Sequence, residues 1–334
     1  MDYLNALVAF LNFVVVPALS YGSQLAIGAL GVTLIFAILR FSNFAWGDTM
    51  AFGTTLVILI TWWFQSMGIS GGPLPTALLA LPLAFVGTAA LMLVTDKWVY
   101  QFYRKQKAKP IILVIVSAGV MFVMNGVVRL IIGTAEQNFS DGERFVLSAQ
   151  QFKDWTGLAE GLAIKTTTAV TLVTALVTMA ALFWFLQKTR TGKSMRAFSD
   201  NEDLALLSGI NPDRVVQVTW VIAAALAVIA GTMYGLDKSF RPFIYFSMLL
   251  PIFAAAVVGG LGSPMGAVAG GFVVAFSEIV VTYAWKKVLG YILPADWAPD
   301  TLMQLLSTDY KFAVSFSILI IVLLFMPTGL FRGK

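Results

Sequence analysis

The chain has 334 residues, of which 59% are hydrophobic and only 12% are charged, and its formal net charge is +5. One water-soluble core could not bury so much apolar surface, and soluble domains carry about 25% charged residues. Cysteine and histidine are absent, which excludes disulfides, thiolate chemistry and imidazole-dependent metal sites or catalysis. The composition therefore predicts an integral membrane protein without a metal or another cofactor.

The hydropathy pattern predicts an all-α integral membrane protein that forms a single domain over 1–334. A transmembrane helix needs about 20 mostly apolar residues. Region 245–281 is also apolar, but glycine and proline interrupt it, which predicts two helices or a re-entrant hairpin joined by a tight turn. Beside this broken pair, about eight stretches are clear spans, namely 4–20, 22–40, 49–67, 74–94, 111–133, 166–186, 216–236 and 311–327.

The loop charges predict an orientation. Lysine and arginine gather in loops 95–110 and 187–215, whereas acidic residues outnumber basic ones in loop 134–165. Cytoplasmic loops are enriched in basic residues. Alternating the spans then places both basic loops and both termini in the cytoplasm, with loop 134–165 on the opposite side. Because these loops account for the positive charge, we expect the lipid bilayer as a partner and no nucleic acid.

Loop 187–215 contains signals for a short helix. Asp200 is a suitable N-cap, and Gly209 is a typical residue just beyond a helix end. The sequence therefore predicts a helix of about two turns over 201–208.

Two leucines of this predicted helix, Leu204 and Leu207, lie three positions apart and share one face. A helix this short is marginal alone in water, so it needs something to pack against. It is therefore either an ordinary loop helix lying on the membrane surface or a docking helix for a soluble partner.

Three blocks of the sequence are similar to one family of transport proteins. Residues 203–209 (DLALLSG) resemble the Glu-Ala-Ala-x-x-x-Gly loop of bacterial ABC importer permeases, with Asp203 and Leu204 in place of Glu and Ala. The other blocks lie within 30–48 (LGVTLI, then NFAWGD) and 259–278 (GGLGSPMGA, then GG and Glu). Together they resemble the permease family of the Liv-type branched-chain amino acid importers.

The resemblance implies a permease subunit in the bacterial inner membrane, carrying a small polar solute such as a branched-chain or other amino acid. A second permease subunit, identical or homologous, completes the pathway. Two cytoplasmic ABC ATPases drive transport, so this chain itself is not an enzyme, and a periplasmic binding protein delivers the solute. In that scheme 187–215 is the cytoplasmic coupling loop, and the residues toward the ATPase are Arg196, Asp200, Asp203, Leu204, Ala205, Leu207 and Gly209.

Several polar residues fall within or beside the predicted spans. Ionisable groups at membrane depth are costly and usually face a cavity or a partner. They are candidates for the translocation pathway, although interfacial snorkelling of Arg129 and Glu278 and a loop position for Asp48 are the structural alternatives. The family usually has histidine where this chain has Trp46, so a role of that histidine does not transfer. The pathway candidates are Asn43, Trp46, Asp48, Asn125, Arg129 and Glu278.

Gly262, Gly266 and Gly270 recur at every fourth position. Small residues at this spacing let helix backbones approach closely in membranes. They predict helix packing, either within the subunit or against a second permease, rather than a binding site.

Two other functions stay open at this level. An ion-coupled secondary transporter, working without an ATPase, needs coupling carboxylates, for which Asp48 and Glu278 are the candidates, and such proteins often contain an internal repeat that is not evident here. A membrane-embedded enzyme without histidine or cysteine needs a Ser–Lys or Asp–Asp arrangement, and none stands out at membrane depth.

Overall fold

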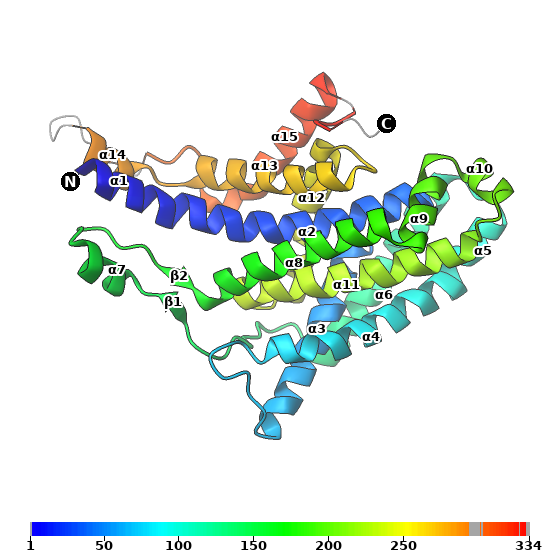
Figure 1. Cartoon of the computed structure of the whole chain (residues 1–334), viewed down its shortest axis with the longest axis horizontal. Coiled ribbons are helices and arrows are strands. Elements are labelled where there is room, and N and C mark those ends of the chain that lie inside the picture. Colours follow the sequence, from blue (N-terminus) through cyan, green and yellow to red (C-terminus); the bar gives the residue numbers. More distant parts are fainter. Residues whose placement is uncertain (1, 294–300, 302, 327, 332–334) are drawn as a thin grey trace.

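The computed structural model describes residues 2–293, 301, 303–326 and 328–331. Its long helices lie roughly side by side in an elongated bundle (Figure 1). The short connecting elements gather at the two ends of this bundle. One end, named the α7 end, carries α7 (Ala149–Thr156) and α14 (Lys286–Ile292), and the other, named the α10 end, carries α9 (Arg190–Asp200) and α10 (Glu202–Leu207).

Residues 2–39 form one continuous helix through the centre of the bundle. It consists of α1 (Asp2–Phe10), a single π-helical turn η1 (Leu11–Val15) and α2 (Val16–Leu39). The prediction of two separate spans at 4–20 and 22–40 is wrong. The π turn ends two residues before Pro17, which occupies the second position of α2 and lacks an N–H, and the turn accommodates this residue without ending the helix. At 1.5 Å per residue the helix is about 57 Å long, and most of it is buried against α11 and α13.

This continuity also changes where the first helix begins. Oδ1 of Asn5 accepts hydrogen bonds of 3.1 Å and 3.2 Å from the backbone N–H groups of Ala159 and Glu160, so α1 begins at the α7 end. Near the other terminus, the N–H of Leu330 donates to the carbonyl of Val258 at 2.8 Å, toward the α10 end. The described ends of the chain thus lie toward opposite ends of the bundle, unlike the expectation that both lie on one side, because one helix replaces two predicted spans.

The remaining long helices follow the predicted spans closely. Several of them begin with proline, which the first turn tolerates because its N–H groups have no partner inside the helix. In chain order they are α3 (Trp46–Ser66), α4 (Ala77–Thr95) with its extension through η2 (Asp96–Tyr100) and α5 (Gln101–Lys105), α6 (Pro110–Ile132), α8 (Thr166–Lys188), α11 (Pro212–Lys238), α12 (Pro242–Gly259), α13 (Pro264–Thr282) and α15 (Lys311–Phe325).

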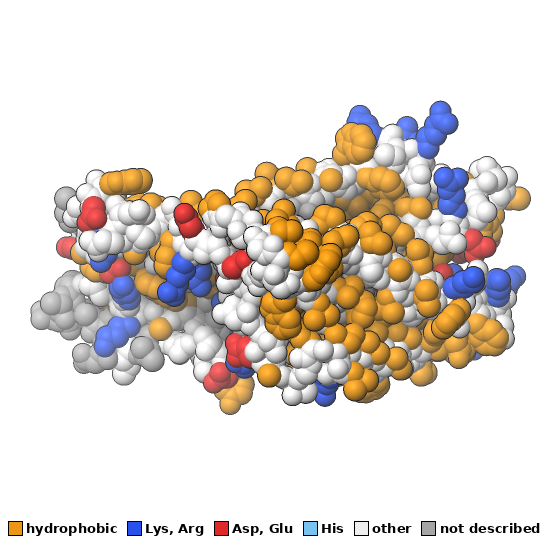
Figure 2. Space-filling model, turned by 90° about the horizontal axis from the view of Figure 1, so that it is seen from below, with side chains coloured by type: hydrophobic (Ala, Val, Ile, Leu, Met, Phe, Trp, Pro, Cys, Tyr) orange, Lys and Arg blue, Asp and Glu red, His pale blue; other side chains and the backbone are white. Residues whose placement is uncertain are grey.

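Within the described residues, eight helices are long and apolar enough to cross a membrane. The chain is thus a multi-pass membrane protein of the all-α class, as predicted. Figure 2 shows hydrophobic side chains covering the middle of one face, with most of the charged side chains toward the two ends. Residue 327, the last of the span predicted at 311–327, lies outside the described residues.

The loop between α6 and α8 contains the short strands of the structure. β1 (Phe145–Leu147) pairs antiparallel with β2 (Ile164–Lys165), and α7 lies between them. Ser148 and Gln151 form a capping box at the start of α7. The 3₁₀ turn η4 (Thr308–Tyr310) leads into α15.

Region 245–281 is a helical hairpin in which residues 260–263 connect α12 to α13. A Cβ on Gly266 would lie 2.1 Å from the carbonyl oxygen of Gly259, and one on Gly270 would lie 2.0 Å from that of Ala255. The two glycines thus let α13 pack directly on the backbone of α12 within the subunit.

Gly262 differs from the other two members of the glycine repeat. It lies in the turn before α13 with a φ of +87°, and a Cβ there would meet no atom within 4 Å. Its small size serves the backbone conformation of the turn rather than helix packing. The part of the repeat that packs against α12 therefore begins at Gly266.

Candidate functional site

The short helix predicted at 201–208 is α10, and its first turn is capped by Asn201. Oδ1 of Asn201 accepts a hydrogen bond of 3.0 Å from the N–H of Leu204. Asp200 is instead the last residue of α9, so its backbone is helical and the predicted N-cap role is wrong. Asn201 has the extended backbone that an N-cap requires, with φ −153° and ψ 107°. Gly209 follows the helix with φ +79°, as a C-terminal glycine does.

α10 presents an apolar edge to its surroundings. Leu204 is 61% exposed and Leu207 is 85% exposed, whereas Ala205 is buried on the inner side of the helix. Asp203 is exposed beside the two leucines. The helix is thus attached to the bundle through Ala205, and its two predicted contact leucines are free to meet another molecule.

Arg196 and Asp200 lie in a different place from the exposed leucines. Both line a cavity of about 600 Å³ between α2, α9 and the turn that joins α12 to α13. The guanidinium of Arg40, just after α2, donates a hydrogen bond to the carbonyl of Ser199 in α9. The coupling candidates therefore fall into two groups, one on the outer side of α10 and one between α9 and the membrane helices.

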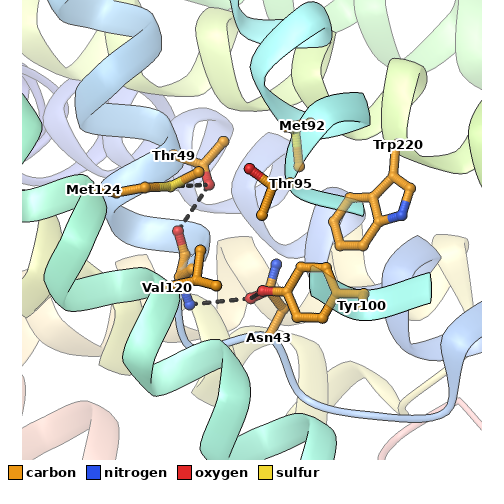
Figure 3. Close-up of a pocket in the computed structure, with 9 residues that line it drawn as sticks. Asn43, Thr49, Met92, Thr95, Tyr100, Val120, Met124 and Trp220 are labelled. Carbon is orange, nitrogen blue, oxygen red and sulfur yellow. Dashed lines mark hydrogen bonds between the residues drawn. The ribbon is translucent and has the colours of Figure 1, made fainter. Parts of the chain in front are cut away.

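A second group of polar residues surrounds the start of α3 (Figure 3). Oδ1 of Asn43 accepts hydrogen bonds from the hydroxyl of Tyr100 at 3.3 Å and from the N–H of Ala45 at 3.1 Å. The cavity beside Asn43 measures about 10 Å³, which is room for one water molecule. This cavity is too small to hold an amino acid.

Asp48 and Asn125 are in direct contact, although 77 positions separate them in the sequence. The side-chain N–H of Asn125 donates a hydrogen bond of 2.7 Å to Oδ1 of Asp48, which connects α6 to α3. Asp48 is buried, and its Oδ2 has no hydrogen-bond partner within the described part of the chain. Arg129 lies one helical turn after Asn125, but its side chain is exposed.

Trp46 is fully buried, and its indole ring packs against α2. A Cβ on Gly31 would lie 2.1 Å from Cη2 of this ring, so glycine leaves the space that the indole fills. The residue that replaces the expected histidine is therefore part of the packing between α2 and α3.

Glu278 lies apart from both groups, in the half of the bundle nearer the α7 end. Its carboxylate is buried, and its Oε1 accepts a hydrogen bond from the hydroxyl of Ser315 on α15. It lines a cavity of about 680 Å³ bounded by α2, α8, α11, α13 and the start of α15. This is named the α7-end cavity.

Lys311 and Tyr21 line the same cavity and were not among the predicted residues. Nζ of Lys311 lies 5.0 Å from the centroid of the Tyr21 ring. Lys311 is the first residue of the apolar stretch 311–327, and a charged residue in this position is the sequence feature that makes it a candidate site residue. Its proximity to Tyr21 is tertiary and leaves no trace in residue spacing.

Comparison with known proteins decides the family. The family model described as "Branched-chain amino acid transport system / permease component" matches residues 14–323, which is most of the chain. The chain belongs to this family. It is 32% identical over 317 residues to the high-affinity branched-chain amino acid transport system permease protein LivH of Escherichia coli K12, covering 92% of this chain and 91% of LivH.

Other members of the permease family match over similar lengths. LivH of Salmonella typhimurium is 31% identical over 316 residues, with 92% of this chain and 91% of that protein covered. The permease protein BraD of Pseudomonas aeruginosa is 27% identical over 321 residues, with 94% of each chain covered. The predicted resemblance to Liv-type permeases is thereby confirmed, and the relatives are transport subunits rather than enzymes.

Among solved structures, PsaBC from Streptococcus pneumoniae in complex with Fab aligns over 94% of this chain and 91% of that chain, with 13% identity and a TM-score of 0.47.

Proposed function

We propose that this chain is the membrane-spanning subunit of a bacterial ABC importer for branched-chain or other amino acids. It would form the translocation pathway together with a second permease subunit, identical or homologous. Two cytoplasmic ABC ATPases would drive transport, and a periplasmic binding protein would deliver the solute. Membership of the branched-chain amino acid permease family is the observation that carries this proposal.

The arrangement at the α10 end supports the ATPase part of the proposal. Leu204 and Leu207 are exposed at one end of the molecule, outside the long helices. A pair of exposed leucines on a short capped helix suits insertion into an apolar groove of a soluble subunit. Asp203 would add a polar contact beside them, and Arg196 and Asp200 would transmit the movement of α9 to α2.

The distribution of charge supports an orientation. Loops 95–110 and 187–215 are rich in lysine and arginine and belong to the α10 end, which we place in the cytoplasm. The α7 end then faces the periplasm, together with the beginning of α1. Residues 328–331 lie with the α10 end, so the two ends of the chain are on opposite sides of the inner membrane.

Polar residues at two depths support a route through the bundle. Glu278 lies in the half nearer the proposed periplasmic face, and Asn43, Asp48 and Asn125 lie near the start of α3. We place them along the path of the solute.

The decisive experiment is co-purification followed by reconstitution. The tagged chain is expressed with its genomic neighbours, extracted in mild detergent and analysed for bound subunits. We expect a stoichiometric ATPase and a second permease chain or a second copy of this one. Proteoliposomes of that complex, supplied with the binding protein, should then take up leucine only when ATP is present on the ATPase side.

The same experiment identifies the main alternative. A chain that purifies alone and takes up leucine along an ion gradient, with uptake abolished by an uncoupler, would overturn the proposal in favour of a secondary transporter.

A further inference from the structure

The α7-end cavity gathers buried polar atoms that lack hydrogen-bond partners. Oε2 of Glu278, the hydroxyl of Tyr21 and the hydroxyl of Ser20 all belong to residues that line it. Each atom is buried, and by distance and angle none forms a hydrogen bond among the residues the structure describes, although the Tyr21 hydroxyl and the Glu278 carboxylate lie close enough to interact with each other. A buried polar group without a hydrogen-bond partner is energetically unfavourable. Three such groups around one cavity indicate that the cavity accommodates a polar occupant.

Two opposite charges face this cavity without forming an ion pair. Glu278 lines it from α13 and Lys311 from the start of α15. The two charges are near enough to interact electrostatically. Among the described residues, however, the ion pairs with N···O distances up to 4.0 Å do not include this couple. A carboxylate and an ammonium group are thus held beside the same space with a gap between them.

The other charged residues of the cavity do not compete strongly for this role. Asp237 pairs with the exposed Lys238 at 3.6 Å, and it also lies close enough to Lys311 to interact with it electrostatically, so it adds a second, already paired carboxylate on the Lys311 side. Lys165 also lines the cavity, but its side chain is exposed to solvent. Glu278 and Lys311 are therefore the buried or partly buried couple that a ligand with two opposite charges would meet.

The rest of the wall is largely apolar. Phe13 and Val16 contribute from the first helix and Ile279 from α13. The volume of about 680 Å³ falls within the range of typical small-molecule sites, which is roughly 300–1,000 Å³. An apolar surface beside a separated pair of charges matches the chemistry of an amino acid with an apolar side chain.

We infer that the α7-end cavity is a binding site, within this single subunit, for a zwitterionic amino acid with an apolar side chain. The α-ammonium group binds Oε2 of Glu278, with the hydroxyls of Tyr21 and Ser20 close by, and the α-carboxylate binds Nζ of Lys311. The side chain packs against the apolar wall. A zwitterion in this position satisfies both charges at once, which neither a pure cation nor a pure anion does. The inference deepens the proposed function and relies on it for the periplasmic position of the cavity.

The first test is equilibrium binding of radiolabelled leucine to the purified full chain in lipid nanodiscs. Three unlabelled competitors displace the radiolabelled leucine in separate experiments. They are leucine itself, leucinamide, which lacks the carboxylate, and isocaproate, which lacks the ammonium group. We expect both analogues to need at least about tenfold higher concentrations than leucine, roughly 1.4 kcal/mol in binding free energy. Equal competition by isocaproate would overturn the inference, because the ammonium group would then play no part in recognition, and equal competition by leucinamide would overturn it in the same way for the carboxylate.

The second test removes one charge at a time. Glu278→Gln and Lys311→Gln should each weaken leucine binding about tenfold or more, whereas Glu143→Gln, which changes an exposed carboxylate in the loop between α6 and α8, should leave it unchanged. Because a change at a buried group can disturb folding, Ala163→Trp serves as an independent variant that fills the cavity from its loop wall. It should abolish binding, and its matched control Ala163→Ser should not. Unchanged binding by Ala163→Trp would contradict the inference.

The failure of this inference is distinguishable from the failure of the proposed function. If the chain co-purifies with an ATPase and supports ATP-dependent leucine uptake, while the Glu278 and Lys311 variants transport like the unmodified chain, the site is wrong and the importer assignment stands. If leucine binds in the charge-dependent manner but no ATPase is found, the site stands and the importer assignment falls.

Discussion

The indole N–H of Trp220 donates a hydrogen bond of 2.7 Å to Oδ1 of Asp96, and this contact connects α11 to the extension of α4. The guanidinium of Arg104 pairs with the same carboxylate, with 3.0 Å between Nη2 and Oδ2. Asp96 is buried, and the Arg104 side chain is only 19% exposed. One carboxylate therefore satisfies two donors that reach it from different helices at the α10 end.

Replacing Asp96 by alanine should destabilise the folded protein strongly. The variant leaves the guanidinium of Arg104 and the N–H of Trp220 without their acceptor, and removing one partner of a buried ion pair costs about 3–5 kcal/mol. Thermal unfolding in detergent, followed by intrinsic fluorescence, measures the loss. Asp96→Asn keeps an acceptor for Trp220 and should lose less, and an unchanged melting temperature for Asp96→Ala would show that the contact contributes nothing.

The close approach of α13 to α12 gives a prediction with a matched control. In Gly270→Ala the new Cβ would lie 2.0 Å from the carbonyl oxygen of Ala255, so the two helices must separate. Gly119→Ala on α6 introduces the same methyl group where no atom lies within 4 Å. We expect loss of the monodisperse detergent-solubilised protein for the first variant and a normal elution profile for the second. Equal profiles would mean that α12 and α13 can move apart easily.

Hydropathy is sufficient to predict most of this fold, because a bilayer requires long apolar helices. Hydropathy is insufficient for residues 2–39, because an expected span length of about 20 residues divides this one long apolar stretch into two spans. The glycine at this division, Gly22, does not end the helix. A Cβ there would lie 2.6 Å from a ring carbon of Phe272, so Gly22 serves packing between α2 and α13. Whether a glycine breaks a helix or lets two helices approach depends on its neighbours in space, and the chain order does not reveal them.

The polar candidates illustrate the same limit. Asp48 and Asn125 are separate candidates in the sequence, and only the fold reveals that they are hydrogen-bonded to each other. Glu278 is a candidate from the sequence because an acid within an apolar span is costly, but its proximity to Lys311 and Tyr21 results from the packing of three different helices. The cost of burying a charged side chain can be inferred from its own segment of sequence, whereas the contacts that make up a site depend on how distant segments pack together.

The continuous first helix can be tested by labelling, because the chain contains no cysteine and single cysteines are therefore unambiguous. Tyr3→Cys and Trp155→Cys introduce thiols at positions that are 76% and 78% exposed at the α7 end. We expect both to react with a membrane-impermeant maleimide in spheroplasts, and Lys105→Cys, on α5, to react only after permeabilisation. If Tyr3→Cys behaved like Lys105→Cys, residues 2–39 would have to cross the membrane twice.

Glu160 attaches the loop after α7 to α14 and gives a pH-dependent prediction. Burial alone would raise the pKa of its carboxyl, but hydrogen bonds from Lys287 and Tyr291 outweigh this and hold the pKa below its ordinary value. The distances are 2.7 Å from Nζ of Lys287 and 2.7 Å from the hydroxyl of Tyr291. A carboxyl with a lowered pKa stabilises the folded state above its unfolded pKa, and this contribution disappears as the pH falls through the folded pKa.

Glu160→Gln should therefore lower the melting temperature at pH 7, and the difference from the unmodified chain should shrink as the pH falls below the ordinary pKa of glutamate, about 4.3. Melting curves of both proteins between pH 7 and pH 3 measure this difference. Exposed Glu143→Gln serves as the control and should show a small, pH-independent difference. A constant gap for Glu160→Gln across the range would mean that the ionised carboxylate contributes nothing through these two donors.

The two exposed leucines of α10 give the sharpest test of coupling. In the double variant Leu204→Asp/Leu207→Asp, two charges replace the apolar edge, so insertion into an apolar groove of an ATPase should become unfavourable. We expect normal membrane insertion, loss of at least about 90% of ATP-dependent uptake, and loss of the co-purifying ATPase. Lys105→Asp, on α5 at the same end, changes the net charge equally without touching the leucines and should transport normally. Normal uptake by the double variant would mean that α10 is an ordinary loop helix on the membrane surface. If the double variant and Lys105→Asp lost ATP-dependent uptake equally, the loss would be due to the changed charge at the α10 end. Only a loss restricted to the leucine variant identifies α10 as the docking element.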